Sequence, residues 1–166
     1  MEFLNPNSDN AQGGWLPSVG TTIWEVTDEG VESHNADTDY ALHDGLGSLT
    51  MEIDVVDPTE STEATTVHIR AVAKITAGTA PPVSLIIALV IDGIRVNGES
   101  FLLSTSYETF VAAFEGDWNT AQLNGARILI ETDVGPDLGE EIRVTAMDMM
   151  IYGPPPGSLT TLGVGV

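Results

Sequence analysis

The sequence predicts an all-β protein, a two-sheet antiparallel sandwich of about eight strands. Apolar and polar residues alternate with period two through several short segments, as in strands with one buried face. Gly-containing turns such as Asp92-Gly93 and Asn124-Gly125 separate these segments, and no amphipathic pattern is long enough for a three-turn helix. Among sandwiches a jelly roll is favoured. A chain of 166 residues suits a single domain with a substantial core.

Two segments show the alternation most clearly. Residues 49–55 place Leu, Met, Ile and Val on one face and Thr, Glu and Asp on the other. Residues 67–75 do the same, with His68, Arg70 and Lys74 on the polar face. Both patterns indicate strands that turn one face to the core and one to water.

Residues 83–91 are apolar at almost every position and end at Asp92-Gly93. This short run, rich in Ile and Val, favours a central strand over a helix. Its second face then needs a cover: loops of the other sheet, a terminal arm or another subunit. Ile86 and Val90 are therefore candidate partner contacts.

Five further strands and one helical turn complete the expected elements. The strands are placed near residues 22–26, 100–104, 109–114, 126–131 and 141–152. In the last of these the apolar phase changes, which predicts a β-bulge near Ala146. The helical turn is expected near residues 117–123, with Asn119 or Thr120 as its N-cap.

Both ends of the chain differ from the middle. Residues 1–20 are expected to form an N-terminal arm, residues 21–152 the sandwich, and residues 153–166 a Pro/Gly-rich C-terminal arm. The last segment, GPPPGSLTTLGVGV, carries no charge, and its three prolines favour an extended conformation. It is either a frayed tail or an arm that lies on a neighbouring subunit. The apolar arm residues expected to contact a partner are Phe3, Leu4, Leu159, Leu162, Val164 and Val166.

The charge balance limits the partners. Five Lys and Arg against 25 Asp and Glu give a formal net charge of −20. Such a surface repels phosphate, so we expect neither nucleic-acid binding nor docking on anionic membranes. The chain has no Cys, which excludes disulfides and thiolate metal sites. The N-terminus lacks the basic and apolar regions of a signal peptide.

No recognised catalytic motif occurs in the sequence. We therefore predict that the protein is not an enzyme and has no resident cofactor. Carboxylates in the acidic loops could bind Ca²⁺, which takes oxygen ligands. The weak candidates are Asp37, Asp39, Asp133 and Asp137; the competing interpretation is that these loops are simply solvated.

The large aromatic residues also allow two interpretations. They could form a platform on which sugar rings stack, or they could pack in the core and at sheet edges. The residues concerned are Trp15, Trp24, Trp118, Tyr40, Tyr107 and Tyr152. The sequence alone does not separate these alternatives.

An ordered set of short motifs resembles a family of small virion proteins of tailed phages. It begins with Gly-Trp-Leu-Pro-Ser-Val-Gly at residues 14–20 and Ile-Trp-Glu-Val-Thr-Asp-Glu at residues 23–29. It continues with the strand at 67–75, Trp118-Asn119-Thr120, and Ile-Arg-Val-Thr-Ala at residues 142–146. Together these motifs span roughly residues 14–152.

The resemblance implies a structural protein with a β-sandwich fold. The function expected first is capsid decoration: a homotrimer that binds the major capsid protein on the outer surface of the virion and stabilises the assembled shell. Such a protein would be made in the host cytoplasm. The alternative is a module of the tail or fibre that binds carbohydrate on the host surface.

Overall fold

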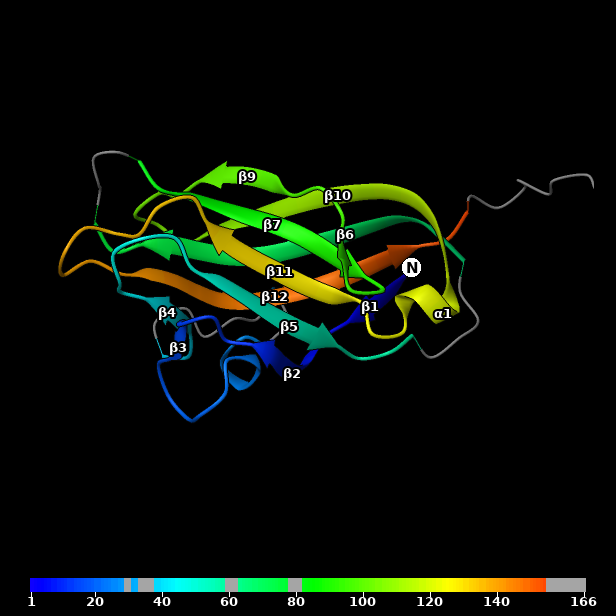
Figure 1. The fold of residues 1–166 in the computed structure, drawn as a ribbon, viewed down its shortest axis with the longest axis horizontal. Helices are drawn as coiled ribbons and strands as arrows, with labels where there is room; N and C mark the ends of the chain where they lie inside the picture. Colours follow the sequence, from blue (N-terminus) through cyan, green and yellow to red (C-terminus); the bar gives the residue numbers. More distant parts are fainter. Residues whose placement is uncertain (29–30, 33–37, 59–62, 78–81, 155–166) are drawn as a thin grey trace, which may run out of the picture.

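The computed structural model describes residues 1–28, 31–32, 38–58, 63–77 and 82–154 (Figure 1). Two antiparallel sheets pack face to face, which confirms the all-β sandwich. The described residues contain twelve strands instead of about eight. The additional strands are short and lie mainly in the N-terminal segment.

Sheet A and sheet B each contain six strands. Sheet A has the order β10 (Glu108–Asn119), β6 (Glu63–Ile75), β12 (Ile142–Tyr152), β4 (Ala41–His43) and β3 (Leu16–Pro17), with β1 (Glu2–Leu4) also on β12. Sheet B has the order β2 (Pro6–Ala11), β5 (Thr50–Val55), β11 (Arg127–Thr132), β7 (Ser84–Ile91) and β8 (Ile94–Arg95), with β9 (Glu99–Leu102) also on β7. Figure 1 shows the long strands of the two sheets running along the length of the molecule.

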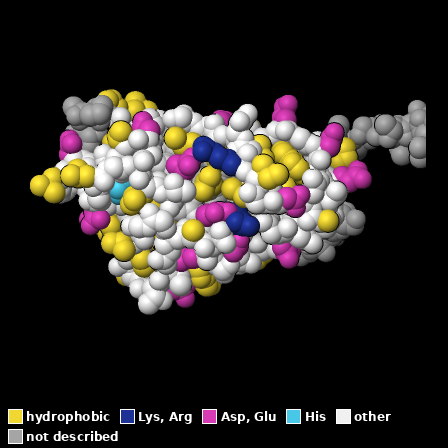
Figure 2. Space-filling model, in the orientation of Figure 1, with side chains coloured by type: hydrophobic (Ala, Val, Ile, Leu, Met, Phe, Trp, Pro, Cys, Tyr) yellow, Lys and Arg dark blue, Asp and Glu magenta, His cyan; other side chains and the backbone are white. Residues whose placement is uncertain are grey.

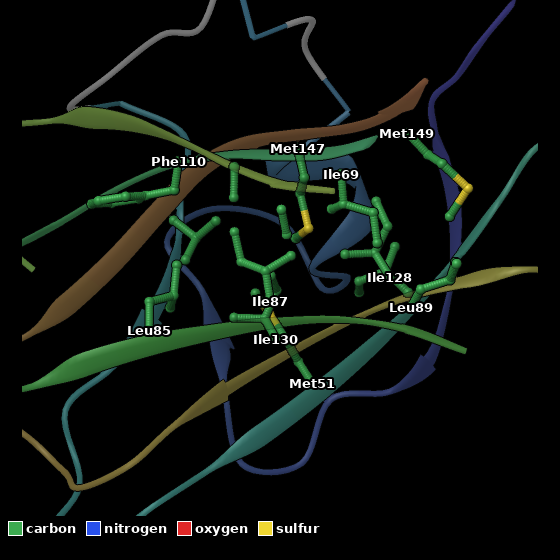
Figure 3. Close-up of a cluster of buried hydrophobic side chains, with 14 of the residues drawn as sticks. Met51, Ile69, Leu85, Ile87, Leu89, Phe110, Ile128, Ile130, Met147 and Met149 are labelled. Atoms are coloured by element: carbon green, nitrogen blue, oxygen red, sulfur yellow. The ribbon is translucent and has the colours of Figure 1, made fainter. Parts of the chain in front are cut away.

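The core lies between the sheets and is built by the alternating residues that the sequence singles out (Figure 3). Ile69 and Met147 of sheet A face Ile87 and Ile130 of sheet B, and all four are fully buried. Burying each such side chain contributes roughly 1.5–3 kcal/mol. Within the described residues, no helix is both long and apolar enough to span a membrane.

The N-terminal residues do not form a separate arm. Residues 1–20 supply β1, β2 and β3 to the two sheets. Leu4 pairs with Met149 and is only 1 % exposed, so it belongs to the core and cannot contact a partner in this fold. Phe3, its neighbour on β1, points the other way and is 48 % exposed. The alternation of a strand explains this difference, and only Phe3 stays available as a contact.

The prediction of a strand near residues 22–26 is wrong. The chain forms a 3₁₀ turn, η1 (Trp24–Val26), at this place. The carboxylate of Asp9 accepts the backbone N–H groups of Ile23 and Trp24, each at 2.8 Å. Because these two donors are satisfied by a side chain from β2, the segment does not need a strand partner.

Two local predictions are confirmed. The register of β12 against β6 shifts between Val144 and Ala146, which is the expected bulge, and the hydroxyl of Thr145 donates to the carbonyl of Asp39 at 2.8 Å. The helical turn is α1 (Thr120–Leu123). Asn119 is its N-cap and forms a capping box with Gln122.

The outer face of β7 is covered by the protein's own chain. The turn after β8 folds back, and Val96 donates its N–H to the carbonyl of Leu89 at 2.7 Å. Gly98 lies so close that an added Cβ would stand 3.0 Å from the Ile86 side chain. Ile86 is half-buried, and Val90 is 5 % exposed in a cluster with Ala88 and Leu129. Another subunit is therefore not required to cover this face, and Val90 is not an available contact.

His43 is buried where two loops meet at one end of the sandwich. Its Nε2 donates to the carbonyl of Gly47 at 2.9 Å, and its Nδ1 accepts the N–H of Gly45 at 3.2 Å. This pair of bonds fixes the neutral imidazole with the proton on Nε2. Burial lowers the pKa of His43 below its usual value of 6.5.

We expect the buried His43 to lower the free energy of unfolding in mild acid. The pKa is lower in the folded than in the unfolded chain, so below about pH 6.5 the unfolded chain binds the proton more readily and stability falls. His43→Gln should reduce this decline between pH 7 and pH 5, measured by urea unfolding at several pH values. His68→Gln, a half-buried histidine on β6, is the matched control. Equal pH dependence in the wild type and His43→Gln would contradict the assignment.

Candidate ligand pocket at the end of sheet A

A pocket of about 420 Å³ lies where β6 begins and where β10 and β12 end. Its volume falls in the range of small-molecule sites in proteins. Segments far apart in the sequence meet there, because the register pairs Asn119 with Glu63 and Trp118 with Ala64. The lining residues are Glu63, Ala64, Thr65, Asp117, Trp118, Asn119 and Pro154.

Trp118 gives the pocket its aromatic wall. The register of β10 against β6 shifts between Glu115 and Trp118, and this bulge includes Gly116. A Cβ added at Gly116 would stand 2.6 Å from the indole ring, so the glycine provides the space in which the ring lies. Trp118 is half-buried and packs against the core on one side. The backbone and the core together hold the indole in place.

The polar side chains of the pocket form hydrogen bonds and are either acidic or neutral. Glu63, Asp117 and Asn119 are exposed. Asn119 is held by its capping box, because its Oδ1 accepts the N–H of Gln122 at 3.1 Å. Neither Lys nor Arg is among the lining residues. The pocket therefore combines an aromatic ring with two carboxylates and a carboxamide.

The strands β6 and β12, whose ends meet at the pocket, carry two further rings, those of His68 and Tyr152. Tyr152, two residues before Pro154, pairs with Thr66, which follows Thr65 of the lining. The ring of Tyr152 lies 4.7 Å from that of His68, centroid to centroid, and both residues are half-buried. In the next row across the sheet, Phe3, Met150, His68 and Ala113 stand side by side. The rings of Phe3, His68 and Tyr152 form a strip on these strands, and no local sequence pattern predicts it because it depends on strand pairing.

The other aromatic residues considered from the sequence have structural roles. Trp15 is fully buried, and Trp24 packs against the core. Tyr107 lies under the ammonium group of Lys74 at 4.2 Å, and Tyr40 lies under the guanidinium of Arg143 at 4.4 Å. These cation–π contacts occupy the two tyrosines. Of the six residues, Trp118 is the one that lines the pocket.

Arg70 on the outer face of sheet A is neutralised. It donates to both carboxylate oxygens of Asp148, at 2.8 and 2.6 Å, and to Glu32 at 2.7 Å. The hydrogen bond with Asp148 is the largest cause that raises the pKa of Arg70 above its usual value. No uncompensated positive charge of Arg70 is therefore left near the strip.

On the outer face of sheet B, the arginine side chains also pair with carboxylates. Arg127 pairs with Glu52 and Asp54, and Arg95 pairs with Glu131 at 2.5 Å. On the face of the molecule in Figure 2 the few cationic side chains lie among acidic ones. Each exposed pair contributes little to stability, but together they leave no basic patch on this face.

The Ca²⁺ candidates do not form a site in the described part of the chain. Asp133 accepts the backbone N–H groups of Ser84 at 2.7 Å and of Val134 at 2.8 Å, a structural role. Asp137 is exposed in the loop between β11 and β12, and Asp37 lies outside the described residues. Among the residues that the structure describes, no group of three His, Asp or Glu side chains could hold a metal ion. Asp39 therefore belongs to no such group. The apolar residues Leu159, Leu162, Val164 and Val166 also lie outside the described residues.

The sequence matches no protein-family model and no curated protein. Among solved structures, a xylan-binding module of family CBM15 superposes with a TM-score of 0.49 and 14 % identity, over 93 % of this chain and 99 % of that one. A family 16 carbohydrate-binding module gives 0.47 and 15 % identity, over 85 % and 93 %. The enzymatically active domain of tailspike protein 4 of bacteriophage CBA120 gives 0.48 and 14 %, over 89 % of this chain but only 21 % of that one. At these scores and identities, the likenesses do not indicate a ligand for this chain.

Proposed function

We propose that this protein is a non-catalytic domain that binds carbohydrate in the Trp118 pocket. One observation carries the proposal: an indole fixed by a bulge lines a cavity of about 420 Å³ together with the hydrogen-bonding side chains of Glu63, Asp117 and Asn119. A sugar ring has an apolar C–H face that can pack on an indole and hydroxyl groups that can donate to carboxylates. The pocket supplies both kinds of partner.

Binding is favoured over hydrolysis by the setting of the two carboxylates. The general acid of a glycosidase is a carboxyl group kept in an apolar environment. Glu63 and Asp117 are both exposed. We therefore assign them to ligand binding and not to bond cleavage.

Replacement of Trp118 tests the proposal. Trp118→Ala should weaken glycan binding by about 2 kcal/mol, roughly 30-fold, as expected for a buried aromatic anchor of an interface. A glycan array would identify the ligand, and calorimetry would measure its affinity. Trp24→Ala is the matched control, because Trp24 also packs against the core but does not line the pocket.

A second variant tests whether binding depends on the position of the Trp118 ring as well as on its presence. Gly116→Ala keeps the indole but places a methyl group where the ring now lies. We expect weaker binding with Trp118 still present. Unchanged glycan affinity in both Trp118→Ala and Gly116→Ala would contradict the proposed site.

The same proteins test the competing hypothesis of capsid decoration. Leu4 and Val90, two of the contacts expected for that function, are buried within the chain. The wild type and Trp118→Ala would be mixed with mature empty capsids, and bound protein measured by density. Stoichiometric binding by both, without retention on a glycan array, would overturn the carbohydrate proposal. It would favour a trimeric protein docked on the major capsid protein.

A further inference from the structure

We infer that the Trp118 pocket prefers a sugar with a free amino group, such as a glucosamine unit, over neutral or acidic sugars. The inference rests on the proposed function and specifies the ligand of the same pocket. It follows from the charges that the fold leaves uncompensated. A protonated amine on the ligand would supply the cation that the pocket lacks.

The pocket contains two carboxylates and no cation. Glu63 comes from the start of β6 and Asp117 from the bulge of β10, and both line the cavity with Trp118. Among the described residues, neither carboxylate forms an ion pair. Glu115, on the same strand, is exposed and adds a third negative charge nearby.

The arginines compensate carboxylates elsewhere. Arg70 pairs with Asp148, Arg95 with Glu131, Arg127 with Glu52, and Arg143 with Glu141. These four pairs all lie on strands or next to them, and none of their residues lines the pocket. In a chain with a net charge of −20, the four arginines pair with carboxylates on the sheets. The carboxylates of Glu63 and Asp117 keep the pocket anionic.

An ammonium group would gain from both kinds of side chain in the pocket. Two carboxylates that line one pocket attract an ammonium group there more strongly than a single carboxylate does. An indole also attracts a cation through its ring quadrupole. A uronic acid would instead be repelled, and an N-acetylated amine would carry no charge to be attracted.

A matched pair of ligands tests the inference. Glucosamine and N-acetylglucosamine oligomers of equal length differ in charge but share the sugar ring. At a pH that keeps the amine protonated and at low salt, we expect glucosamine oligomers to bind the wild type about tenfold more tightly. This preference corresponds to about 1.4 kcal/mol, and it should shrink as salt is added.

Isosteric variants locate the selectivity. Glu63→Gln and Asp117→Asn keep the shape of each side chain and remove its charge. Each should reduce the preference for glucosamine to within about threefold. The preference is the ratio of the two affinities in the same variant, so a loss of hydrogen bonding that weakens both oligomers equally leaves it unchanged. Asp137→Asn, in the loop between β11 and β12, makes the same change in net charge and should keep the full preference.

The outcomes separate this inference from the proposed function. Equal binding of both oligomers, lost in Trp118→Ala, would overturn the amino-sugar preference and support the carbohydrate pocket. A preference that persists in Glu63→Gln and Asp117→Asn would also overturn the inference, since the attraction would then come from the whole acidic surface. Absence of binding to any glycan on the array would overturn the proposed function itself.

Discussion

Gly13→Ala is expected to destabilise the protein by about 4 kcal/mol or more, close to the largest effects of single substitutions. Gly13 follows β2 with φ +56°, and an added Cβ would stand 1.5 Å from the carbonyl oxygen of Thr50 on β5. The backbone would have to move, because no flexible side chain can yield. Trp15, two residues later and fully buried, would be displaced with it. The measurement is the free energy of unfolding from urea titration.

Gly125→Ala separates the cost of the clash from the cost of the backbone angle. Gly125 has φ +76°, but nothing lies within 4 Å of its added Cβ. Only the left-handed conformation then costs energy, about 1 kcal/mol. If both variants lose the same stability, the close approach of Gly13 to β5 is not the cause, and the strand arrangement around Thr50 would need revision.

The sequence predicted the central strands well because period-two alternation reports directly on burial. Residues 49–55 and 67–75 correspond to β5 and β6, and the change of phase near Ala146 corresponds to a bulge. The N-terminal segment reads as an arm in the sequence because its strands are two to six residues long and partly polar. Such strands are specified by their partners on β5, β4 and β12, which no local pattern shows.

The pocket could be predicted only in part. Trp118 and the Asn119 cap were visible in the sequence, whereas the neighbouring carboxylate of Glu63 lies more than fifty residues away in the chain and reaches the pocket through the register of β6 and β10. The second face of β7 shows the same limit. Its apolar side chains predict a cover by loops of the other sheet, a terminal arm or another subunit, but the cover is a turn of the same sheet that carries Gly98.

The Arg70–Asp148 pair is expected to be the most important ion pair for stability. Asp148 is 2 % exposed on β12, and both of its carboxylate oxygens accept hydrogen bonds from Arg70. Arg70→Met would leave a buried carboxylate without its partner and should cost about 3 kcal/mol. The free energy of unfolding at neutral pH measures this loss.

Two further variants decide whether the stability lost in Arg70→Met comes from the unpaired carboxylate of Asp148. Arg95→Met removes the exposed pair with Glu131 and should cost less than about 1 kcal/mol. The double variant Arg70→Met/Asp148→Leu removes the buried pair entirely and should recover much of the stability lost in Arg70→Met alone. A double variant no more stable than Arg70→Met would mean that the loss comes instead from packing, including the contact of the guanidinium with the Phe3 ring at 5.6 Å. That outcome would shift the role of Arg70 from charge compensation on β12 to support of β1 through the Phe3 ring.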